Sequence, residues 1–307
     1  MYNEKIANMS PSSLGCRNIA LSKIIIAMLI FGSIGLFRRY IPVSSGLLAF
    51  SRGLLGAVFL LCFYKLRGGV FFNSLDRKSG LWFCISGALL GINWMLLFEA
   101  YNNTTVAIAT LCYYMQPTIV ILLSSFFFQE ELTKKKLILA GIAVLGMLFI
   151  SGIFEGAAIF DANLKGIVWA LSASCLYAAV VIMNKKAALS ARAHDQTIVQ
   201  LVASAVVLIP YLLLTENFTT LSINAGSLLL IGVLGIVHTG IAYMLFFGSM
   251  DELPAQTIAM LSYIEPLMAL LLSALVLHEL LTPFGILGAI LILGTTFLAE
   301  KGDKVIT

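Results

Sequence analysis

TLCYYMQPTIVILLSSFFFQEELT, at residues 110–133, returns later in the chain as AMLSYIEPLMALLLSALVLHELLT, at residues 259–282. The two stretches align without a gap at an offset of 149 residues, and each joins a Tyr-x-x-Pro motif to a Glu-x-Leu-Thr motif. Two apolar helices can resemble each other by composition alone, but these motifs are not generic apolar sequence. We therefore interpret the pair as an internal duplication. The matched positions are Tyr114 and Tyr263, Pro117 and Pro266, Ser124 and Ser273, Glu130 and Glu279, Leu132 and Leu281, and Thr133 and Thr282.

The chain that contains this duplication is unusually apolar. Of its 307 residues, 60% are hydrophobic and 11% are charged, and the mean hydropathy is +0.99. Soluble domains are about half apolar and about a quarter charged, so this chain has too few polar groups to cover a globular surface. The composition therefore excludes a soluble enzyme, a secreted disulfide scaffold and a disordered chain. It predicts an all-α polytopic membrane protein.

The charge and cysteine content narrow the expected partners. A net charge of +4 is too small and too scattered for binding to nucleic acid. Four of the five cysteines fall inside apolar runs, where a thiol acts as a small hydrophobic group. We expect no disulfide framework, no metal site and no cofactor, and we expect membrane lipid and a small-molecule substrate as partners.

Apolar runs separated by charged or turn residues predict ten transmembrane helices, since a span takes about 20 residues. Five form a first repeat at residues 19–153, five form a second repeat at residues 164–299, and short segments at 1–18 and 300–307 flank them. The predicted spans are 19–37, 44–64, 80–99, 105–128, 137–153, 164–183, 197–214, 227–248, 255–277 and 283–299.

The positions of the basic residues predict the orientation of these spans. With both termini cytoplasmic, fifteen of the nineteen lysines and arginines fall on the inside, as the positive-inside rule requires. Each repeat has an odd number of spans, so the second copy must be inverted relative to the first. Inverted repeats are typical of secondary transporters, whose substrate site lies near the membrane midplane between the halves.

This arrangement, with a proline in the fourth helix of each half and a glutamate at its end, resembles the EamA-type transporters of the drug/metabolite transporter superfamily. SSGLLAFSRGLLGAVFLL at residues 44–61 also looks like the second helix of that family, with its early arginine. The resemblance covers residues 19–298. It implies ten helices, cytoplasmic termini, a central cavity and ATP-independent movement of a small metabolite. The aromatic-glycine signature of the family's first helix is weak here, at Phe31 and Gly32.

Polar side chains within the spans are candidates for binding or coupling, because each one needs a partner or a watery cavity. Glu265 is the foremost candidate: it precedes Pro266, which removes a helical hydrogen bond, and it could bind an ammonium group or a coupling proton. Its repeat partner is the neutral Gln116. The alternative is a glutamate that only joins helices.

The remaining candidates have structural alternatives of their own. His238 could relay protons or bind substrate, or it could donate to the carbonyl of a neighbouring helix. Arg52 could face an anionic group of the substrate, or it could pair with a helix end or a glutamate. Aromatic and amide side chains could enclose an amine through cation–π attraction, or they could simply pack. This softer set is Asn93, Trp94, Tyr113, Tyr114, Tyr177, Asn184, Tyr243 and Tyr263.

Other residues of the repeat are assigned structural roles. Pro117 and Pro266 are expected to interrupt their helices. Glu130 and Glu279 are expected at helix ends, where each accepts hydrogen bonds from the start of the next helix. The GxxxG motif of Gly87 and Gly91 predicts close helix packing.

The predicted function is secondary active transport across the cytoplasmic membrane. The substrate expected first is an amino acid or a related amine that is exported, with a coupling proton as a candidate partner; uptake of a quaternary amine such as choline is the alternative. No nucleophile–base set, HExxH or Walker pattern supports an enzyme. A channel would favour rings of like side chains from an oligomer, and both a monomer and a homodimer remain open.

Overall fold

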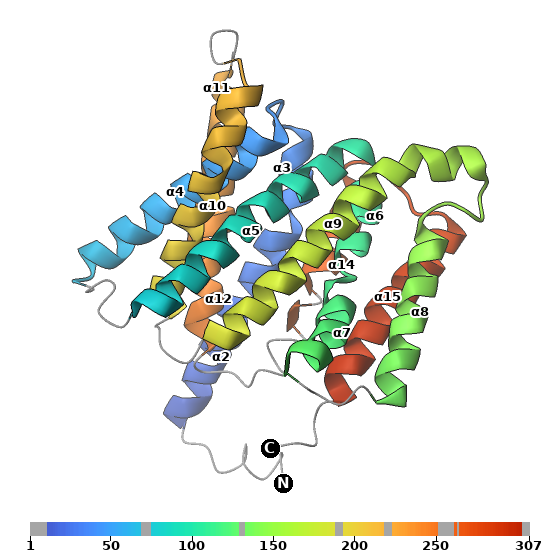
Figure 1. Ribbon diagram of the computed structural model, residues 1–307, viewed down its shortest axis with the longest axis horizontal. Coiled ribbons are helices and arrows are strands. Elements are labelled where there is room, and N and C mark those ends of the chain that lie inside the picture. The colour runs from blue at the N-terminus through green and yellow to red at the C-terminus, as the bar shows by residue number, and fades with distance from the viewer. Residues whose placement is uncertain are drawn as a thin grey trace.

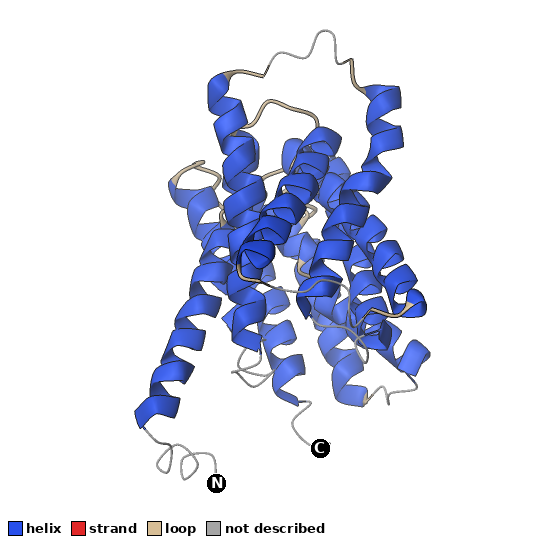
Figure 2. Cartoon of the chain, turned by 90° about the vertical axis from the view of Figure 1, so that its left-hand side faces the viewer, coloured by secondary structure: helices blue, strands red, loops and turns tan. Residues whose placement is uncertain are grey.

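The computed structural model describes residues 11–68, 75–128, 133–187, 193–217, 223–250, 261–262 and 264–302. All regular secondary structure within these ranges is helical, and the helices form one bundle (Figures 1 and 2). The elements are α2 (Pro11–Gly32), α3 (Ile34–Arg39), α4 (Ser45–Leu66), α5 (Arg77–Asn103), α6 (Val106–Tyr113), α7 (Gln116–Phe128), α8 (Lys134–Ile150), α9 (Ala157–Ala187), α10 (Ala193–Thr215), α11 (Ala225–Gly235), the π-helix η1 (Ile236–Ile241), α12 (Ala242–Met250), α14 (Ile264–Leu275) and α15 (Pro283–Gly302).

The helices are long and apolar, as the composition predicts. Among the described residues, seven segments are long and apolar enough to cross a membrane: Asn18–Arg39, Ser45–Leu66, Arg77–Asn103, Val106–Leu123, Ile159–Asn184, Asp195–Thr215 and Ala225–Phe246. Ile264–Leu275 and Pro283–Thr295 are shorter apolar helices. Each predicted span overlaps helix, but the part of the ninth span at 255–260 lies outside the described residues and α8 has only 17 residues. The count of ten spans therefore stays a prediction.

Three interruptions divide the long segments. Ser33 separates α2 from α3, and the Tyr114 and Met115 turn separates α6 from α7. The second break agrees with the sequence, because Pro117 lies in the first turn of α7, where a missing backbone N–H costs no intrahelical hydrogen bond. The third is η1, which lies between α11 and α12 and widens the helical turn.

Small residues allow the central helices to pack closely. An added Cβ at Gly87 would lie 2.5 Å from the carbonyl oxygen of Gln200, and one at Gly91 would lie 2.4 Å from that of Ser204. Both contacts are with α10, so the prediction that this GxxxG motif serves close helix packing is confirmed. α5 also packs along α9, which places α5 in the middle of the bundle (Figure 1).

The helix ends fall on two opposite sides of the bundle. α2 begins, α8 begins and α15 ends on one side, whereas α3 ends and α6 begins on the other (Figure 1).

The threonines of the two Glu-x-Leu-Thr motifs act as N-caps. Thr133 Oγ1 accepts from the Lys136 backbone N–H at the start of α8, and Thr282 Oγ1 accepts from that of Gly285 in α15.

Candidate functional site

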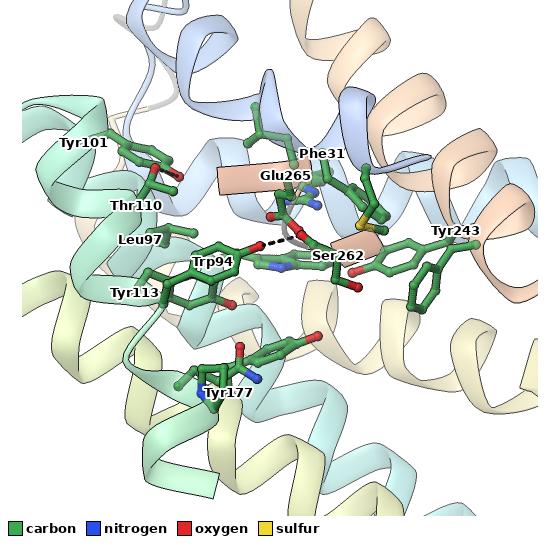
Figure 3. Close-up of a pocket in the computed structure, with 17 residues that line it drawn as sticks. Phe31, Trp94, Leu97, Tyr101, Thr110, Tyr113, Tyr177, Tyr243, Ser262 and Glu265 are labelled. Carbon is green, nitrogen blue, oxygen red and sulfur yellow. Dashed lines mark hydrogen bonds between the residues drawn. The ribbon is translucent and has the colours of Figure 1, made fainter. Parts of the chain in front are cut away.

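A cavity of about 260 Å³ lies where helices from the first and second parts of the chain meet (Figure 3). Among its described lining residues, aromatic rings predominate, with one basic and one acidic side chain. They are Met28, Phe31, Ile34, Arg52, Trp94, Leu97, Tyr101, Thr110, Tyr113, Tyr114, Gln116, Pro117, Tyr177, Tyr243, Phe246, Ser262 and Glu265.

The carboxylate comes from Glu265 in the first turn of α14. The start of α14 lies close against the end of α2, because an added Cβ at Gly32 would lie only 2.5 Å from the Glu265 carbonyl oxygen. Tyr114, from the break between α6 and α7, donates through its hydroxyl to the Ser262 carbonyl oxygen at 3.4 Å (Figure 3). The break in the first part of the chain therefore meets the start of α14 in the second part.

The guanidinium comes from Arg52, which is only 4% exposed. Its Nε donates to the Thr239 hydroxyl at 2.8 Å, and its Cζ lies 4.2 Å from the ring centroid of Trp94. Thr239 belongs to η1 and donates to the Leu234 carbonyl oxygen at 3.2 Å, a bond over five residues that matches the π-helical turn. Two neighbouring elements therefore fix the orientation of this buried cation.

Aromatic side chains line the same cavity as these two charged groups, and several of them pack against one another. The Tyr113 and Tyr177 ring centroids lie 5.9 Å apart, and those of Phe31 and Tyr243 lie 5.3 Å apart. Aromatic faces attract cations, and the attraction increases when water is excluded. The site can therefore receive a small cationic group without a dense set of polar ligands.

The candidates predicted from the sequence fall into three groups: residues that line the cavity, residues that lie elsewhere in the bundle, and residues outside the described ranges. Glu265, Arg52, Trp94, Tyr114 and Gln116 meet in the cavity, together with Tyr243 and Pro117. His238 and Asn93 are not among its lining residues. Tyr263 and Glu130 lie outside the described residues.

His238 and Asn93 join helices instead. The His238 Nε2 lies 2.8 Å from the Ser33 hydroxyl, and its Nδ1 lies 3.3 Å from the Val233 carbonyl oxygen. Asn93 Nδ2 donates to the Ala173 carbonyl oxygen in α9 at 2.6 Å. Arg52 was expected to pair with a helix end or a glutamate if it did not face substrate, but its side-chain partners among the described residues are Thr239 and Trp94.

Glu279 has a role that the sequence predicted only in part. It accepts hydrogen bonds from the Arg39 guanidinium at 2.6 Å, the Val106 backbone N–H at 2.8 Å and the Ser273 hydroxyl at 2.7 Å. Arg39 also donates to the Thr104 carbonyl oxygen at 2.7 Å. We name these five residues the Glu279 cluster.

The expectation that Glu279 accepts from the start of the next helix is wrong. It accepts from the start of α6, whereas Thr282 caps the following helix α15. The physical reason is the backbone turn at His278, whose φ of 57° lies in the left-handed region just before Glu279 and ends the run of α14. The cluster therefore connects α3 and α6 of the first part to the end of α14 in the second.

Sequence reasoning missed three polar lining residues: Tyr101, Thr110 and Ser262. Tyr101 was placed beyond the third span because Glu99 was taken as the span's end, but α5 continues to Asn103. Thr110 and Ser262 belong to the duplicated stretches, which is the signal that could have found them. Neither is ionisable, so neither stood out.

Comparison with known proteins identifies relatives of this chain. The model of the EamA-like transporter family matches residues 18–152 and again residues 164–300. The chain is 29% identical to the uncharacterized transporter YxxF of Bacillus subtilis (strain 168), over 83% of this chain and 81% of that protein. It is 27% identical to the uncharacterized transporter YojE of the same organism, over 67% of this chain and 66% of that protein. One crystal structure superposes with a TM-score of 0.64 at 20% identity, covering 93% of this chain and 99% of the other, which shows a shared fold.

Proposed function

The chain belongs to the EamA-like transporter family, and from this premise we propose that it is a secondary active transporter of a small metabolite, working by alternating access in the cytoplasmic membrane. The family, its transporter-named relatives and its many apolar helices make it a multi-pass membrane protein. The observation that carries the proposal is the cavity of about 260 Å³ between the two matched parts of the chain. Transporter sites lie in this position between repeats.

The lining of the cavity supports an amine as substrate. Glu265 is the one acidic group among the described lining residues, and the Tyr114 and Tyr177 rings lie on the same cavity. A carboxylate within aromatic walls attracts an ammonium group by charge and by cation–π interaction. An amino acid or a related amine, carried outward, is the substrate we propose. A quaternary amine such as choline would use the same carboxylate and rings.

Alternating access requires that the cavity be closed toward one side at a time. The Glu279 cluster joins the two matched parts at the side where α3 ends (Figure 1). In the duplicated sequence the counterpart of Glu279 is Glu130. We propose that the two glutamates close opposite sides in the two states of an inverted ten-helix repeat.

Glu265 is also the proposed carrier of a coupling proton. The charged or titratable side chains that share its cavity are Arg52, Tyr101, Tyr113, Tyr114, Tyr177 and Tyr243. A carboxylate can exchange a proton for a substrate ammonium, because the two compete for the same negative charge. In this exchange a proton that moves inward down its gradient would drive the export of one substrate molecule.

The test is transport by the purified protein in liposomes that contain no ATP. We expect uptake of labelled amino acids or amines down a gradient, and a fall of about tenfold or more in Glu265→Gln, since the buried ammonium would lose its counter-charge. Glu216→Gln is the matched control, because Glu216 follows α10 away from the cavity. If Glu265→Gln keeps the wild-type rate and pH dependence, the assigned role of Glu265 is wrong.

A further inference from the structure

We infer that Arg52 is the binding group for a carboxylate of the substrate, so that the cavity selects a zwitterion with one ammonium and one carboxylate group. This inference rests on the proposed function, which supplies the ammonium site at Glu265. It adds a second charged binding site, for a carboxylate, and makes Arg52 a residue that determines substrate specificity.

The first argument is the unused bonding capacity of Arg52. A guanidinium has five N–H donors, and the structure gives Arg52 one hydrogen-bond acceptor, the Thr239 hydroxyl at Nε. Among the described residues no acceptor is bonded to its two terminal nitrogens, although the side chain is only 4% exposed. The two terminal nitrogens form the fork that binds a carboxylate in bidentate fashion.

The second argument is the relation of Arg52 to Glu265. Both line the cavity, yet the described atoms of these two residues form no ion pair within 4.0 Å. An arginine that only balanced this glutamate would gain most in direct contact, because attraction falls with distance. Two opposite charges held apart on one cavity instead leave room for an occupant that carries the complementary pair.

The third argument is that Arg52 is held in place from two sides. Trp94 stacks 4.2 Å from its Cζ, and Thr239 holds its Nε from the π-helical turn. Such fixed orientation favours planar recognition of a carboxylate and reduces the entropy lost on binding. Thr239 is therefore a positioning residue: it acts on the substrate through Arg52.

A free guanidinium also bears on the alternative substrate. A quaternary amine could occupy the ammonium site at Glu265, but it has no anionic group to place at Arg52. The terminal nitrogens of the buried guanidinium would then lose water without gaining an acceptor, which costs free energy. We therefore expect choline and simple amines to be poor substrates.

The experiment compares matched sets of three compounds in ATP-free liposomes. The twenty amino acids are screened first. For the best one, its decarboxylated amine and its deaminated acid are then measured, together with choline. We expect wild-type protein to favour the amino acid over either counterpart by about tenfold or more in kcat/KM, since each counterpart leaves one buried charge unpaired.

Variants then test which charged group of the substrate Arg52 binds. Arg52→Gln should lower kcat/KM for the amino acid about tenfold or more while changing that for the amine less than about threefold. Thr239→Val should raise KM for the amino acid severalfold with little change in kcat, and Thr239→Ser, which keeps the hydroxyl, should restore it. Arg67→Gln is the matched control, because Arg67 is an exposed arginine just after the end of the same helix.

The possible outcomes distinguish a failure of the zwitterion inference from a failure of the proposed function. Transport of amines or choline without amino acids would overturn the zwitterion inference and leave the proposed function standing. Transport of neither amines nor amino acids would overturn the proposed function itself. An equal loss of amine and amino acid transport in Arg52→Gln, with no effect of Thr239→Val, would reduce Arg52 to a structural role. If Arg52→Gln does not fold, the wild-type comparison and the Thr239 variants still decide.

Discussion

His238 shows how a buried ionisable side chain can serve the helices around it. One ring nitrogen lies 2.8 Å from the Ser33 hydroxyl at the break between α2 and α3, and the other lies 3.3 Å from the Val233 carbonyl oxygen just before the π-helical turn. Its ring also packs against Phe37, with centroids 4.5 Å apart. The side chain therefore satisfies polar groups at two helix irregularities at once.

This position predicts a structural effect of replacing His238. His238→Ala should lower the free energy of unfolding by about 1–3 kcal/mol, because the Ser33 hydroxyl and the Val233 carbonyl lose a buried partner. The fall should appear as a lower Tm in scanning fluorimetry of the detergent-solubilised protein. The KM for substrate and the pH profile of transport in liposomes should stay as in the wild type. A shifted pH profile with an unchanged Tm would instead make His238 a proton relay.

The sequence identifies some residues of the site and not others, for reasons specific to each residue type. Glu265 and Arg52 stand out because ionisable groups are rare in apolar spans, and Tyr114 stands out because it belongs to a proline motif. What no pattern shows is which way a buried polar group points. His238 and Arg52 looked alike as candidates, and only packing against Ser33 or Trp94 separates them.

At the scale of elements, the interruptions of the helices build the cavity. The break at Ser33 lets Phe31 of α2 and Ile34 of α3 both reach the lining, and the turn at Tyr114 does the same for α6 and α7. Broken helices at the midplane are typical of transporter sites, because their unpaired backbone groups are tolerated only beside a cavity.

The contact between α2 and α14 gives a prediction on this scale. Gly32→Ala should reduce transport and lower Tm by several degrees, because the new methyl group would lie 2.5 Å from the Glu265 carbonyl oxygen and overpacking costs about 1–3 kcal/mol. Gly232→Ala is the control: nothing lies within 4 Å of a Cβ there, and alanine favours a helix over glycine by about 1 kcal/mol. Wild-type transport and Tm in Gly32→Ala would contradict the close approach.

Helices were easier to predict from the sequence than their breaks. Apolar runs located α4 (Ser45–Leu66) and α10 (Ala193–Thr215) within a few residues. The proline motif also located the break before α7. The break at Ser33 and the π-turn η1 have no comparable signal, because Ser and Gly occur within continuous helices and tertiary contacts decide whether a turn widens.

At the scale of the whole molecule, one side of the bundle is held together by a polar cluster. The Glu279 cluster joins helices from the two matched parts on the side where α3 ends and α6 begins (Figure 1). Its ion pair is partly exposed, with Arg39 29% and Glu279 16% accessible, so the proposed alternating-access movement could separate it at modest cost. The bond to the Val106 backbone N–H adds the start of α6 to the closure.

The prediction that follows concerns access to the cavity. Glu279→Gln should weaken this closure, because a neutral amide loses the charge that attracts Arg39 and the N-terminus of α6. A cysteine at Thr110, which lines the cavity on α6, should then react several-fold faster with a membrane-impermeant maleimide added to intact cells. The measurement uses a background in which Cys62, Cys84 and Cys175, the exposed thiols among the described side chains, are replaced together with Cys16.

Two control cysteines fix the orientation in the same experiment. Lys135 lies at the start of α8 and Lys165 lies in the first part of α9, and both are exposed. The orientation predicted from the basic residues places Lys165 outside and Lys135 inside, so Lys165→Cys should be labelled in intact cells and Lys135→Cys only after permeabilisation. The reverse pattern would place the Glu279 cluster on the inside and invert the proposed direction of opening.

Equal labelling of Thr110→Cys with and without Glu279→Gln would show that this cluster does not close the cavity, because a carboxylate that closes it must change access when its charge is removed.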